Sequence, residues 1–158
     1  MFGEIMNNKF KLFEKVFSLS CSNDWNKVKR EWIFAEHYES DEILSCACGH
    51  NPITNVYEIH NVKTGKFLQL GSECISKFLP EIEEGLRKNL LLVMKQPNKS
   101  LHLNLINYFV RIGVIDQTES MYYIVNSKRR KLPVVALEHR KTINKKVLPY
   151  CFQINEQL

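Results

Sequence analysis

The spacing of three cysteines limits the folds open to this chain more than any other pattern in it. Cys46 and Cys48 are separated by one residue and followed by Gly49 and His50, and Cys74 opens a segment with helical periodicity. Thiolate and imidazole groups bind Zn²⁺ at close to tetrahedral angles. Two cysteines at a tight turn can bind from one side, and a helix N-terminus stabilises the thiolate of a third. The spacing therefore predicts a zinc site at Cys46, Cys48 and Cys74.

The residues around and between these cysteines predict short strands. Strand character is found in residues 43–46, 56–61 and 66–70. Residues 61–65 separate the last two segments, and Gly65 can take the positive φ that a hairpin turn needs. A hairpin returns the chain close to its starting point, so Cys74 can face the other two cysteines. The order of knuckle, hairpin and helix is that of a treble-clef finger.

A fourth ligand must come from outside the three cysteines. A second cysteine on the helix would stand at position 77, which is Lys77, and a protonated lysine cannot bind a metal. His50 is the first choice because it lies just beyond Gly49. The rivals are His60 and Cys21, followed by Cys151 and His37.

Residues 43–79 resemble a known module. The matching residues are Cys46, Cys48, Gly49, His50 and Ile53, then Ile59, Asn61, Thr64 and Gly65, then Gly71, Ser72, Cys74, Ile75 and Phe78. The module is seen in many uncharacterised proteins of phages, plasmids and other mobile elements. The resemblance implies a small treble-clef-like zinc fold with a structural role, and a metal group of Cys46, Cys48, His50 and Cys74.

The rest of the chain is predicted to be mainly helical. Helices are expected over residues 8–19, 24–32, 73–79, 81–95, 100–113 and 133–146, with caps at Asp24 and Ser72, whereas residues 121–125 fit a strand or a helix. The fold class is therefore α+β, with packed helices and a small hairpin and knuckle. Two parts are expected: residues 1–96, with the zinc module at 43–79 as its core, and a helical basic part at 97–158.

Positive charge is concentrated near the C-terminus. Residues 1–119 carry 14 Lys and Arg against 15 Asp and Glu, whereas residues 120–158 carry 8 against 2. The basic residues form two clusters: Lys128, Arg129, Arg130 and Lys131, then Arg140, Lys141, Lys145 and Lys146. Tyr122, Tyr123 and Tyr150 lie near them and could stack on bases. This distribution predicts a partner that carries negative charge, with DNA or RNA first.

The sequence favours a binding protein over an enzyme. Zinc deaminases combine a His-x-Glu segment with a Cys-x-x-Cys segment, and the chain lacks the second of these. Cys151 with His139 or His102 does not form a recognisable catalytic motif. We therefore expect a non-enzymatic zinc-stabilised protein that binds nucleic acid. The alternative is a protein-interaction module that inhibits or redirects a host nucleic-acid-processing or defence complex, in the manner of an anti-CRISPR inhibitor.

No part of the sequence predicts a membrane span or an export signal. The longest apolar run is residues 90–94, whereas a bilayer span needs roughly 20 residues. Residues 1–11 lack the apolar stretch of a secretory signal. A cytoplasmic location without a membrane partner is the expectation.

Overall fold

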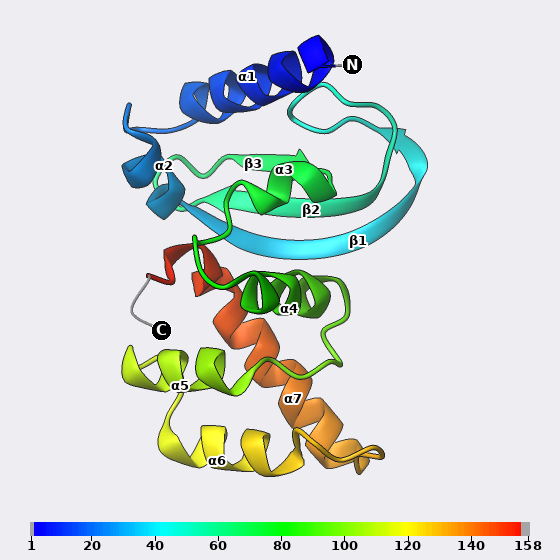
Figure 1. The fold of residues 1–158 in the computed structure, drawn as a ribbon, viewed down its shortest axis with the longest axis vertical. Helices are drawn as coiled ribbons and strands as arrows, with labels where there is room; N and C mark the ends of the chain where they lie inside the picture. Colours follow the sequence, from blue (N-terminus) through cyan, green and yellow to red (C-terminus); the bar gives the residue numbers. More distant parts are fainter. Residues whose placement is uncertain (1, 156–158) are drawn as a thin grey trace. The chain divides into compact units, whose positions relative to one another are not determined.

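A computed structural model describes residues 2–155 of the chain and the side chains of residues 8–155 (Figure 1). This part is α+β, with seven α-helices, one 3-10 helix and one three-stranded antiparallel sheet. Contacts between residues divide the chain into two compact units, Met1–Leu79 and Pro80–Leu158. The sequence interpretation placed the division after residue 96. No helix of the described residues is long and apolar enough to cross a membrane.

Two helices begin the first unit, α1 (Phe2–Ser18) and α2 (Trp25–Glu31). The Asp24 carboxylate accepts the Asn26 N–H at 2.9 Å, so the predicted cap of α2 is confirmed. The prediction that this helix continues through Trp32 is wrong, because the backbone becomes extended there. Trp32 is fully buried and donates its indole N–H to the Ser20 hydroxyl. Trp32 and the apolar residues after it suit a strand better than a helix.

The sheet has the order β1 (Trp32–Leu44), β2 (Ile53–Asn61) and β3 (Phe67–Leu70). The predicted hairpin between β2 and β3 is confirmed. Gly65 has φ +73°, and the Asn61 side chain accepts the N–H groups of Lys63 and Thr64. By contrast, the sequence predicted a strand only at residues 43–46, whereas β1 spans 13 residues. Residues 36–42 are mostly charged or polar, as on an edge strand with an exposed face, so apolar alternation does not reveal the strand.

A buried carboxylate joins the α1–α2 loop to the hairpin turn. Glu31 is fully buried and accepts the backbone N–H groups of Cys21 and Ser22 at 2.7 and 2.9 Å. The Asn61 amide donates to the same carboxylate at 3.2 Å. Burial raises the pKa of Glu31, but the hydrogen bonds lower it further, to about 2. Glu31 is therefore ionised in the folded protein and holds three donors in place.

We expect Glu31→Gln to lower the free energy of unfolding by about 2 kcal/mol, because an amide replaces a charged acceptor of three hydrogen bonds. The folded pKa, about 2, lies below the ordinary value of 4.5. The stabilisation by Glu31 is therefore complete above that ordinary value and is lost as the pH falls toward 2. Urea unfolding between pH 6 and pH 2 measures both effects. The exposed Glu14→Gln control should change neither stability nor its pH dependence, and equal behaviour of the two variants would contradict this role for Glu31.

Helix α3 (Ser72–Ser76) follows β3 and packs against β2 and β3. The predicted cap at Ser72 is wrong: Gly71 is the N-cap, and Ser72 is already the first helical residue, without a capping side chain. The helix also ends before the predicted Leu79. Ile75 and Phe78 are fully buried and anchor this segment in the core of the first unit.

The second unit is helical: α4 (Glu84–Lys95), α5 (Leu103–Arg111), α6 (Gln117–Asn126), α7 (Val134–Val147) and the 3-10 helix η1 (Leu148–Gln153). Residues 121–125 belong to α6, which the capping box of Asp116 and Glu119 begins. A buried polar network links the helices of the second unit. The Tyr123 hydroxyl donates to the Asn144 amide oxygen at 2.7 Å and accepts the Leu101 N–H. This network fixes the loop between α4 and α5 against α6 and α7.

Candidate metal centre

A tight knuckle, residues 46–50 between β1 and β2, presents two of the three cysteines. The Gly49 N–H donates to the Cys46 carbonyl at 2.8 Å, and the Cys46 N–H donates to the His50 carbonyl at 2.9 Å. The Ala47 N–H donates to the carbonyl of Gln69 on β3 at 2.9 Å. These bonds close the knuckle on itself and fasten it to the sheet, so the positions of its cysteines are set by the backbone.

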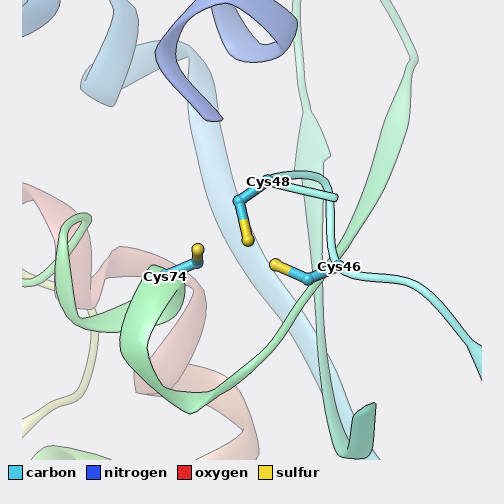
Figure 2. Close-up of side chains that lie close together, drawn as sticks. All are labelled: Cys46, Cys48 and Cys74. Atoms are coloured by element: carbon cyan, nitrogen blue, oxygen red, sulfur yellow. The ribbon is translucent and has the colours of Figure 1, made fainter. Parts of the chain in front are cut away.

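The structure brings together the three cysteines that the sequence spacing selected. The sulfur atoms of Cys46, Cys48 and Cys74 lie within 4.8 Å of one another, and all three residues are buried. Figure 2 shows the three side chains pointing toward a common point, two from the knuckle and one from α3. The β2–β3 hairpin returns the chain to this point, as predicted.

Backbone N–H groups point at two of the sulfurs. The Gly71 N–H lies 3.3 Å from the Cys46 sulfur, and the His50 N–H lies 3.5 Å from the Cys48 sulfur. Such donors stabilise the thiolate over the thiol. These N–H groups favour the thiolate, the form that binds metals, although burial opposes this at Cys48.

The three thiol groups differ in pKa. The hydrogen bond from Cys74, with those from the Cys48 and Gly71 N–H groups, lowers the pKa of Cys46 to about 5, although burial opposes the shift. Burial raises the pKa of Cys48. The hydrogen bond to Cys46 and burial both raise the pKa of Cys74. The thiolate is therefore favoured at Cys46 and the thiol at Cys48 and Cys74, and a metal ion that binds all three sulfurs would displace thiol protons.

The dimensions suit a single ion. Sulfurs at about 2.3 Å from a tetrahedral zinc ion lie about 3.8 Å apart. The observed separations, all within 4.8 Å, need little adjustment to reach that distance. All five cysteines are free thiols. The three close, buried cysteines can therefore hold one metal ion.

The candidates for the fourth ligand lie in different surroundings. His50 is exposed and lines the cavity beside the sulfurs, but its ring is not part of the close group. The His60 ring stacks on Phe67 at 4.3 Å, and Cys21 is exposed on the α1–α2 loop. Neither lines the cavity. His37 hydrogen-bonds the Asn55 side chain. Cys151 is buried within η1 of the second unit.

Half of the predicted nucleic-acid ligands have partners inside the second unit. Arg140 donates to the Asn98 and Asn126 carbonyls. Lys141 pairs with Glu138 at 3.6 Å, and Lys146 pairs with Glu119 at 3.1 Å. Arg129 donates to the Asn126 side chain. These four cations therefore contribute to the packing or surface pairing of α6 and α7.

The other four cations are exposed. They are Lys128, Arg130, Lys131 and Lys145, and none has an acidic partner among the described residues. Three of them lie in the loop between α6 and α7, which also contains the exposed Arg129. Of the nearby tyrosines, Tyr122 and Tyr150 are 42% and 43% exposed, whereas Tyr123 is buried. The α6–α7 loop is thus the part of the basic region most open to a partner.

No family model, curated protein or solved structure matches the chain. The resemblance of residues 43–79 to a mobile-element module therefore remains an expectation from the sequence.

We expect Gly49→Ala to weaken the knuckle. Gly49 has φ +92°, and an added Cβ would meet only Lys11, at an ordinary contact distance of 3.8 Å. The cost is therefore backbone strain, about 1 kcal/mol, rather than a clash. Urea unfolding and metal titration should both show the loss. Gly49→Asn should lose less, because asparagine tolerates positive φ better than alanine; equal stability of the alanine variant and the native chain would refute the strain.

Proposed function

We propose that the first unit is a treble-clef-like module that holds a structural zinc ion through Cys46, Cys48 and Cys74. The observation that carries this proposal is the set of three buried sulfurs within 4.8 Å of one another. Thiolate ligands favour zinc, copper(I) and iron–sulfur clusters. A structural zinc site matches a knuckle and a helix joined by a hairpin, and it needs no redox partner.

The ion would join the knuckle directly to α3, in addition to the contacts that each of them makes with the sheet. Helix α3 has only five residues, too few for a helix to be stable by itself. The knuckle has no regular secondary structure. A metal ion bound to both supplies folding free energy that these short segments lack. The proposed role of the metal is therefore stabilisation rather than catalysis.

We propose further that the second unit binds nucleic acid through the α6–α7 loop. Residues 80–158 carry 13 Lys and Arg against 7 Asp and Glu. Lys128, Arg130 and Lys131 are exposed and have no acidic partner among the described residues. Cations in such a position can neutralise phosphates and release counterions. The protein would then act as a non-enzymatic binding protein.

One observation favours the alternative of a protein partner. Apolar side chains are exposed on both sides of the same loop: Met121 and Val125 on α6 are 64% and 73% exposed, and Val134 and Val135 on α7 are 77% and 73% exposed. Exposed apolar residues next to cations suit an acidic, partly apolar protein surface. A module that inhibits or redirects a host nucleic-acid-processing complex would use this combination.

Two measurements test the proposed function. Metal analysis of the purified protein should give one zinc ion per chain. A mobility-shift assay with generic DNA and RNA at 50 and 200 mM salt should show binding that falls steeply with salt for all sequences. Absence of binding at low salt would exclude the nucleic-acid role and leave the protein partner.

A further inference from the structure

The cavity beside the three sulfurs is far larger than a metal ion requires. Its volume is about 450 Å³, whereas a water molecule takes about 30 Å³. The sulfurs form part of its wall, and the rest comes from α1, the knuckle, the start of β2 and α3. A zinc site with three protein ligands keeps its fourth position for water or another ligand. The cavity gives such a ligand space.

We propose that this fourth position binds a small thiol that carries a carboxylate, the chemical class of cysteine and its short peptides. The proposal rests on the metal site proposed above. Three thiolates make the ion a soft acceptor, and a fourth sulfur suits such an ion better than an oxygen donor. On binding, the ligand would release its thiol proton to solvent, and its sulfur would replace a solvent ligand at the fourth position. No electron is transferred.

Two lysines indicate a carboxylate on the ligand. Lys9 on α1 and Lys77 after α3 both line the cavity, and both are exposed. Neither has an acidic partner among the described residues. Glu73 is the acidic residue among the described lining residues. The Lys9 ammonium lies 5.8 Å from the centroid of the Phe13 ring. Two lysines and one glutamate therefore border the cavity, and either lysine can pair with a carboxylate on the ligand.

The position of His50 leaves room for a ligand from solution. Its backbone N–H donates to the Cys48 sulfur, and its carbonyl accepts the Cys46 N–H, so the backbone of His50 is held within the knuckle. Its side chain is exposed and does not join the three sulfurs. The ring lines the cavity that the ligand would enter.

Cobalt(II) provides the test, because its visible and near-ultraviolet bands report the number of sulfur ligands. The full chain is loaded with one cobalt ion, and 3-mercaptopropionate is added, with 2-mercaptoethanol as the uncharged control. We expect the sulfur-to-cobalt band to grow by about a third as three sulfur ligands become four. The double variant Lys9→Gln, Lys77→Gln should bind 3-mercaptopropionate about five- to tenfold more weakly and 2-mercaptoethanol equally well.

The outcomes separate this inference from the metal site beneath it. A chain that binds no cobalt refutes the metal site itself. If the chain binds one cobalt ion but neither thiol changes the cobalt bands, only the exchangeable fourth position is refuted. If His50→Ala alters the cobalt bands before any thiol is added, His50 is the fourth ligand and the inference is wrong. Equal affinity for the two thiols in the native chain overturns the carboxylate requirement.

Discussion

Replacement of Cys74 by serine should remove the metal from the protein. A serine hydroxyl is a poor zinc ligand, and two sulfurs from a single turn bind zinc far more weakly than three from two segments. We expect the metal affinity to fall by more than about 100-fold and the free energy of unfolding of the first unit to fall by about 3–5 kcal/mol. Removal of the metal from the native chain with a chelator should have a similar effect on stability.

Metal content by elemental analysis and urea unfolding of the loaded protein measure both losses. Hydrogen exchange locates them, because the knuckle and α3 should lose protection before the helices of the second unit. Cys21→Ser is the matched control: this cysteine is exposed and lies outside the group of three sulfurs. It should keep one metal ion and native stability. A Cys74→Ser protein with a full equivalent of zinc would eliminate the proposed ligand set.

The cluster of three cysteines could be predicted from the sequence because its determinants are local. Cys46 and Cys48 share one turn, Gly49 supplies the backbone conformation of that turn, and a hairpin signal ending at Gly65 implies that Cys74 returns to the same place. Each of these features is readable within a few residues. Only the relation between the two ends of the hairpin is long-range, and a hairpin fixes that relation by its geometry.

Features that depend on distant contacts could not be predicted in this way. Glu31 looks like any helical carboxylate in the sequence, and its role depends on hydrogen bonds from residues as far away as Asn61. Arg140 belongs to a basic cluster of the kind that binds nucleic acid, but its guanidinium group donates to the backbone carbonyl of Asn98. By contrast, the pair of Lys141 with Glu138 has the i, i+3 spacing of neighbours on a helix and could have been anticipated.

Charge reversal in the α6–α7 loop should abolish most nucleic-acid binding. In the triple variant Lys128→Glu, Arg130→Glu, Lys131→Glu, three exposed cations become anions. Each lost phosphate contact should reduce the slope of log affinity against log salt by about 1. At moderate salt, we expect the affinity for generic DNA or RNA to fall by about 100-fold or more. Fluorescence anisotropy over a range of salt concentrations measures both quantities.

A second triple reversal separates the loop from net charge. Lys27, Lys63 and Lys66 are exposed on the first unit, so their replacement by glutamate changes the net charge of the chain equally. If the loop is the interface, this control should bind nucleic acid with a salt slope close to that of the native chain. Equal losses in the two variants would mean that overall charge, not the loop, attracts the polyanion. Both variants should keep the metal, because none of the six residues lines the cavity beside the sulfurs.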